Sequence, residues 1–167
     1  MQAPILVAGV GNIFLGDDGF GVEVVKRLGA ETLPEWVRVV DFGIRSIHLV
    51  YELLDNKYAT TILVDAAPRG GEPGTVYLIE PDLLPIETNG FPDAHGINPQ
   101  AVFALLKSLG GAPGKVYIVG CEPARMEECM GLSEPVARAV EEAVNLIVNI
   151  VGRANEAKSE AAASRIK

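Results

Sequence analysis

Short apolar segments alternate with amphipathic helical patterns along this chain, and this alternation constrains the fold more than any other feature. Five apolar segments have the length of a buried strand, and the patterns between them repeat apolar residues at helical spacing. The predicted strands are Ile5–Val10, Val37–Val40, Thr61–Val64, Thr75–Ile79 and Lys115–Val119. The alternation predicts an α/β fold with three layers, in which helices cover both faces of a twisted, mostly parallel five-stranded sheet.

Four helical patterns accompany these strands. Their predicted inward-facing residues are Val22, Val25 and Leu28; Ile44, Ile47, Tyr51 and Leu54; Val102, Leu105, Leu106 and Leu109; and Val136, Val140, Val144, Ile147 and Val151. Ser133 is the expected N-cap of the last helix. The third and fourth strands are joined by only about ten residues, which predicts a hairpin between them and therefore one antiparallel edge strand.

The length of 167 residues suits one domain. We expect residues 1–153 to form a single α/β domain, and residues 154–167, which lack an apolar stripe, to form a flexible C-terminal tail. A formal net charge of -8 disfavours nucleic acid and anionic lipid as partners.

Membrane insertion is not expected, because no apolar stretch approaches the roughly 20 residues that a spanning helix needs. Two cysteines are too few for a disulfide framework, and a cytoplasmic location fits best.

The glycines after the first strand are arranged in part like a dinucleotide-binding turn. Gly9 and Gly11 match that fingerprint, but Phe14 stands where its third glycine belongs, and a bulky side chain there is expected to block the close approach of strand and helix. Read as a phosphate loop instead, the segment has Asp17 and Asp18 where Lys and Ser or Thr are needed, and two carboxylates repel a polyphosphate. A nucleotide-binding, Rossmann-like domain is therefore a disfavoured alternative.

Acidic residues follow several of the predicted strands, at the sheet edge where parallel α/β folds place their sites. Asp18 lies shortly after the first strand, and Asp65 ends an apolar strand that has no structural need for charge. His95 lies in a long polar loop able to cover that edge. Two carboxylates and one imidazole suit a borderline divalent metal such as nickel or zinc. The alternative for Asp17 and Asp18 is a purely structural role at an ordinary helix N-terminus.

Three further residues have competing interpretations. His48 falls within a helical pattern, which favours a partly exposed helical residue over a metal ligand. Cys121 could act as a nucleophile with His95 as its base, or serve as a small buried hydrophobe. Asp41 could bind a ribose hydroxyl or cap the turn before the second helix.

Together these motifs resemble the hydrogenase maturation endopeptidases. The resemblance extends from about Ile5 to Val151 and rests on motifs in the family's order: Gly9-x-Gly11-Asn12, Asp17-Asp18-Gly19-x-Gly21, Asp41-x-Gly43, Asp65-Ala66, His95, Gly120-x-Glu122-Pro123 and Gly131-Leu132-Ser133. It implies a twisted, mostly parallel sheet between helices. It also implies a protease that removes the C-terminal extension of the large subunit precursor of a nickel-iron hydrogenase, after nickel insertion.

In that family two carboxylates and a histidine bind the metal and carry the activity, and they match Asp18, Asp65 and His95. Nickel is then expected to arrive with the substrate rather than to be held tightly, and zinc or cadmium to substitute in vitro. Asp17 and Asp41 are candidate supports for these ligands. The alternative function, in which the protein is not an enzyme, is a non-catalytic maturation chaperone that binds nickel or the precursor in the same pocket.

Overall fold

The computed structural model of the protein describes residues 3–55, 57–81 and 99–164. Its strands are β1 (Ile5–Val10), β2 (Val37–Gly43), β3 (Thr60–Ala66), β4 (Val76–Ile79) and β5 (Lys115–Cys121). Its helices are the 3-10 turn η1 (Gly16–Gly19), α1 (Phe20–Leu28), α2 (Ser46–Leu54), α3 (Pro99–Ser108) and α4 (Glu134–Ser164). The predicted α/β fold class is confirmed.

The five strands form one sheet in the order β2-β1-β3-β5-β4. The first four in this order pair in parallel, and β4 pairs antiparallel with β5 at the edge. The antiparallel edge strand is thus confirmed, but the predicted hairpin between β3 and β4 is wrong because β5 lies between them. The connection from β3 to β4 crosses the end of β5, where Ala67 N–H donates to the Cys121 carbonyl at 2.8 Å and Glu122 N–H donates to the Thr75 carbonyl at 2.9 Å.

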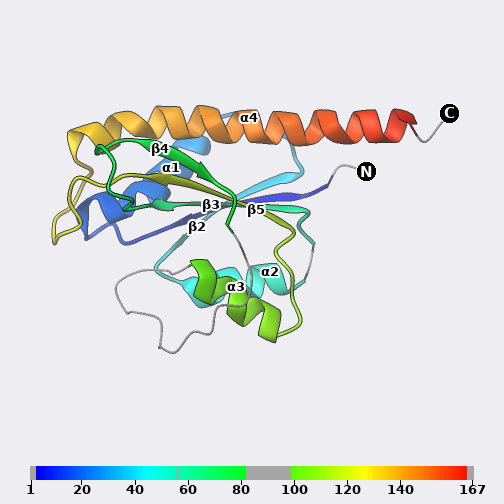
Figure 1. Cartoon of the computed structure of the whole chain (residues 1–167), viewed down its shortest axis with the longest axis horizontal. Helices are drawn as coiled ribbons and strands as arrows, with labels where there is room; N and C mark the ends of the chain where they lie inside the picture. The colour runs from blue at the N-terminus through cyan, green and yellow to red at the C-terminus, as the bar shows by residue number, and fades with distance from the viewer. Residues whose placement is uncertain (1–2, 56, 82–98, 165–167) are drawn as a thin grey trace.

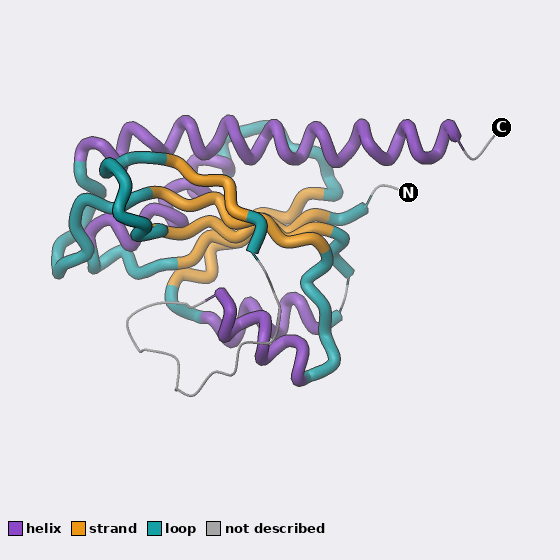
Figure 2. Tube along the Cα trace, viewed as in Figure 1, coloured by secondary structure: helices purple, strands orange, loops and turns teal. Residues whose placement is uncertain are grey.

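The sheet is the middle of three layers (Figure 1). Helices α1 and α4 cover one face, and α2 and α3 cover the other, as the tube in Figure 2 also shows. Strand β1 is buried on both faces: Ile5 and Val7 pack beneath α1 and α4, whereas Leu6 and Ala8 pack against the α2 and α3 layer. Such two-sided burial explains why the central strands are continuous apolar segments rather than alternating ones.

The inward faces of two helices differ from the prediction. In α2 the expected Ile47 and Tyr51 are exposed, as is Ile44 before the helix, while the residues that pack inward are Leu49, Val50 and Leu53. In α3 the predicted Val102 and Leu106 are buried, together with Phe103, but the predicted Leu105 and, just beyond the helix, Leu109 are exposed. Both segments carry apolar residues around much of their circumference, so periodicity alone could not determine which face meets the sheet.

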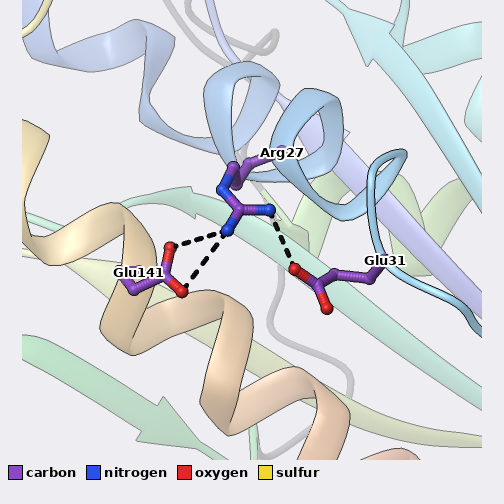
Figure 3. A network of polar contacts seen from close by, with 3 residues as sticks. All are labelled: Arg27, Glu31 and Glu141. Atoms are coloured by element: carbon purple, nitrogen blue, oxygen red, sulfur yellow. Dashed lines mark hydrogen bonds and ion pairs between the residues drawn. The ribbon is translucent and has the colours of Figure 1, made fainter.

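Helices α1 and α4 pack side by side through apolar residues of one core cluster, among them Val24, Leu28 and Val144. Figure 3 shows the polar contact above this core, in which Arg27 pairs with Glu31 at 2.8 Å and with Glu141 of α4 at 3.2 Å. Exposed ion pairs contribute at most about 1 kcal/mol each, so the apolar contacts dominate the joining of these helices.

The last helix is longer than the sequence pattern indicated. The prediction places a tail at 154–167, but α4 continues to Ser164 and extends beyond the sheet (Figure 1). Ala, Glu and Lys have high helix propensity, which explains how the helix continues without an apolar stripe. Mobility of this extension stays a prediction.

None of the helices in the described ranges combines the length and apolar character that a bilayer crossing requires.

Candidate active site

The turn after β1 brings two carboxylates together at the carboxyl ends of the parallel strands. Gly11 has a φ of +132°, and a Cβ placed on it would lie 1.9 Å from the Asp18 carbonyl oxygen and 3.7 Å from Asp65 Oδ1. Its N–H donates to the Gly43 carbonyl at 2.9 Å, which ties the turn to the end of β2. Only glycine fits here, so the Gly-x-Gly motif serves close approach of these segments.

A second glycine lets α1 pack tightly on the sheet. A Cβ on Gly21 would lie 2.0 Å from the Val64 carbonyl oxygen and 2.5 Å from that of Val10. The prediction that Phe14, in the third glycine position, blocks such an approach is wrong. In the structure Phe14 is 61% exposed and Gly21 provides the close contact instead.

The carboxyl groups of Asp18 and Asp65 both have a raised pKa. Asp18 Oδ2 accepts one hydrogen bond from Asn12 N–H at 2.8 Å, and burial raises the pKa of the Asp18 carboxyl. Asp65 Oδ1 accepts one from Ala66 N–H at 2.8 Å. Burial, followed by the negative charge of Asp18, raises the pKa of Asp65 well above its ordinary value. Two such carboxylates favour a divalent cation, which would offset their repulsion, and they disfavour the phosphates of a nucleotide.

Asp17 has a different role from Asp18. Its carboxylate accepts four hydrogen bonds: from Ala124 N–H at 2.8 Å, Arg125 N–H at 2.9 Å, Ser133 N–H at 2.7 Å and the Ser133 hydroxyl at 2.8 Å. Burial by itself raises the pKa of Asp17, but these hydrogen bonds outweigh it and hold the pKa below the ordinary value. Asp17 is therefore an anchor for the segment 124–133, and both of its oxygens accept hydrogen bonds from it.

The glutamate after β5 is a second anchor, to which the sequence pattern assigned no role. Glu122 Oε2 accepts hydrogen bonds from Arg69 N–H at 2.8 Å and the Tyr77 hydroxyl at 2.9 Å, and Oε1 accepts one from Gly70 N–H at 3.1 Å. The bond from Arg69 is the largest cause that lowers the pKa of Glu122. The sequence signal that could have identified Glu122 is its position in the Gly120-x-Glu122-Pro123 motif after the last strand. Glu122 fixes the connection that crosses the end of β5.

The structure also describes three other candidate residues, Asp41, His48 and Cys121. Asp41 is exposed, and its Oδ1 accepts the Gly43 N–H at 2.8 Å, which is the turn-capping interpretation. His48 is exposed on α2, as expected. Cys121 is wholly buried under α4, and burial together with the nearby charge of Asp17 raises the pKa of its thiol to about 12, so the nucleophile interpretation is wrong.

His95, the third expected metal ligand, lies outside the described residues, so its position relative to Asp18 and Asp65 stays a prediction. Within the ranges that the structure describes, no group of three or more His, Cys, Asp and Glu side chains is arranged to hold a metal ion. The structure thus brings together two of the three predicted site residues.

Comparison with known proteins identifies the family. The family model described as hydrogenase maturation protease matches residues 22–150. A Methanocaldococcus jannaschii protein named for hydrogenase maturation protease activity is 40% identical over 148 residues, which cover 86% of this chain and 94% of the relative.

Two solved structures share the fold. The Escherichia coli hydrogenase maturating endopeptidase HybD has a TM-score of 0.75 and 27% identity, covering 90% of this chain and 93% of its own. The [NiFe] hydrogenase maturation protease HycI of Thermococcus kodakarensis has a TM-score of 0.73 and 26% identity, covering 90% and 94%. Since the family model spans most of the chain, this protein belongs to the hydrogenase maturation protease family and is a peptidase.

Proposed function

We propose that this protein removes the C-terminal extension from the large subunit precursor of a nickel-iron hydrogenase after nickel insertion. The observation that carries the proposal is the pair of partly or wholly buried carboxylates, Asp18 and Asp65, at the sheet edge of a chain in this protease family. The similar E. coli protein is a hydrogenase maturating endopeptidase, which supports the same reaction type.

In this proposal nickel is part of the substrate. The carboxylates of Asp18 and Asp65, with His95 as the third ligand, complete the coordination of nickel that the precursor presents. Carboxylate and imidazole groups are suitable donors for a borderline divalent ion, and the mutual repulsion that raises the pKa of Asp65 falls when a cation lies between the two acids. A metal at this position would polarise the scissile carbonyl.

The type of ligand has a consequence for selectivity. Two carboxylates and one imidazole equal in number the three protein ligands of a resident catalytic zinc, but only one of them is a histidine, so we expect a modest site. The protein would therefore bind nickel firmly only together with the precursor's own ligands. Processing then requires a loaded substrate, and an empty precursor keeps its extension.

The proposal also includes a location. Cys121 and Cys129 are both free thiols in the structure. Free thiols suit a reducing compartment, which supports the cytoplasm as the place of the reaction.

The test is incubation of the purified protein with nickel-loaded and with metal-free precursor, followed by mass measurement of the large subunit. We expect a shortened subunit only from the loaded precursor. Stable binding of loaded precursor without shortening would instead support the chaperone function. Equal shortening of both precursors would contradict the role of nickel as part of the substrate.

A further inference from the structure

Several large apolar side chains are exposed in the segments that follow the carboxyl ends of the parallel strands. Of the eleven exposed large hydrophobic residues in the described ranges, five lie in the segments that follow β1, β2 and β5: Ile13, Phe14, Ile44, Met126 and Met130. Phe14 is 61% exposed and Met130 is 67% exposed. We call Ile13, Phe14, Met126 and Met130 the apolar rim. The segments after β1 and β5 meet at the Leu15–Cys129 bridge.

The two halves of the apolar rim are joined by backbone hydrogen bonds. Leu15 and Cys129 form a parallel β-bridge, in which Gly16 N–H donates to the Cys129 carbonyl at 2.9 Å and Cys129 N–H donates to the Phe14 carbonyl at 3.1 Å. Phe14 precedes one bridged residue and Met130 follows the other. Leu15 and Cys129 are only partly exposed, whereas Phe14 and Met130 project into solvent.

The anchoring by Asp17 makes the rim an ordered surface. Asp17 N–H donates to the Arg125 carbonyl at 3.0 Å, and its carboxylate holds both ends of the segment that carries Met126 and Met130. The backbone that carries these exposed apolar groups is therefore fixed before any partner arrives. Phe14 and Met130 are held on the two bridged segments, and Phe and Met are enriched at protein interfaces.

Hydrogen bonds join the apolar rim to Asp18 at the sheet edge. Phe14 N–H donates to Asn12 Oδ1 at 2.9 Å, and Asn12 N–H donates to the carboxylate of Asp18 at 2.8 Å. A polypeptide whose scissile region lies at Asp18 and Asp65 therefore reaches the rim within a few residues. A second copy of this chain on the same surface would obstruct that approach.

We infer that the apolar rim, centred on Phe14 and Met130, is the docking surface for an apolar segment of the precursor polypeptide that flanks its cleavage region. This inference rests on the proposed function, because it takes the hydrogenase precursor as the occupant. The rim then contributes to substrate affinity, while Asp18 and Asp65 contribute to the chemical step.

The test compares two double variants with matched exposure. Phe14→Ser with Met130→Ser alters the rim, and Tyr51→Ser with Leu109→Ser alters residues that are 62% and 53% exposed on the α2 and α3 side of the sheet. Initial cleavage rates are measured against the concentration of nickel-loaded precursor. For the rim variant we expect KM to rise about tenfold or more with kcat within about twofold of wild type. The control should match wild type, and Phe14→Leu should retain most of the affinity.

The outcomes separate this inference from the proposed function. An unchanged KM in the rim variant, with normal cleavage by wild type, would overturn the docking surface alone. Failure of wild type to cleave loaded precursor would overturn the proposed function and, with it, the assigned occupant. Sedimentation that shows a wild-type dimer and a monomeric rim variant would also overturn the inference, because the surface would then serve self-association. Melting curves verify that the variants are folded.

Discussion

Asp17 and Asp18 are consecutive in the chain, yet their carboxylates have opposite environments. Asp17 accepts four hydrogen bonds from the segment 124–133, which lower its pKa. Asp18 accepts a single hydrogen bond from Asn12, and burial raises its pKa. One carboxylate thus anchors the segment 124–133, and the adjacent one keeps acceptor capacity for a cation.

The first prediction concerns the anchor. Asp17→Ala removes the acceptor of four partly buried hydrogen bonds, so the free energy of unfolding should fall by about 3 kcal/mol. This corresponds to a decrease of about 10 °C in melting temperature for a chain of this size. Thermal melting followed by circular dichroism measures it, with Asp55→Ala at the exposed end of α2 as the control. A melting temperature equal to that of the control would show that the four hydrogen bonds contribute little.

The second prediction is the pH dependence of that contribution. Because the folded-state pKa of Asp17 is lowered, its stabilising effect is fully present above the ordinary carboxyl pKa of about 4 and is lost as the pH falls through the lower folded-state pKa. The difference in unfolding free energy between wild type and Asp17→Asn should therefore be constant from about pH 7 to 5 and narrow below about pH 4. Urea titrations at each pH provide the comparison. A difference that widens in acid would contradict the assigned hydrogen bonds.

The third prediction separates function from stability at Asp65. Asp65→Asn removes one of two mutually repelling carboxylates, so the metal-free protein should be at least as stable as wild type. Processing of loaded precursor should fall more than about a hundredfold, because a metal ligand is lost. Asp55→Asn, an exposed acid remote from the site, is the matched control and should process normally. Normal processing by Asp65→Asn would remove this residue from the site.

The fourth prediction concerns His95, to which the family resemblance assigns a metal-binding role. His95→Ala should abolish processing of loaded precursor while the melting temperature changes little. The exposed His48 provides the control as His48→Ala, which should retain full activity. If both histidine variants process at the wild-type rate, imidazole takes no part in the reaction.

The fifth prediction concerns metal removal. A site of two carboxylates and one imidazole is modest, so the protein should be isolated largely without metal and should bind added nickel, zinc or cadmium weakly. A strong chelator should leave the melting temperature unchanged, since the two cores are formed by apolar residues around the sheet. A large decrease in chelator would show that a metal is part of the fold and that nickel is not supplied by the substrate.

The sequence by itself determined the fold class and the sheet edge at which Asp18 and Asp65 lie. Strand length, helical periodicity and glycine position are local properties, and they predicted the five strands, the helices and the accumulation of acids after the strands. The placement of Asp65 at the end of an apolar strand was readable in this way, because parallel strands end at one edge of a sheet.

Tertiary structure decided the choices that depend on distant partners. The insertion of β5 between β3 and β4, the inward faces of α2 and α3, and the burial of Cys121 all depend on which surfaces meet across the sheet. The same holds for Asp17 and Asp18, whose sequence neighbourhood is nearly identical. Their separate roles arise because a segment more than a hundred residues away supplies the donors to Asp17 and leaves Asp18 beside Asp65.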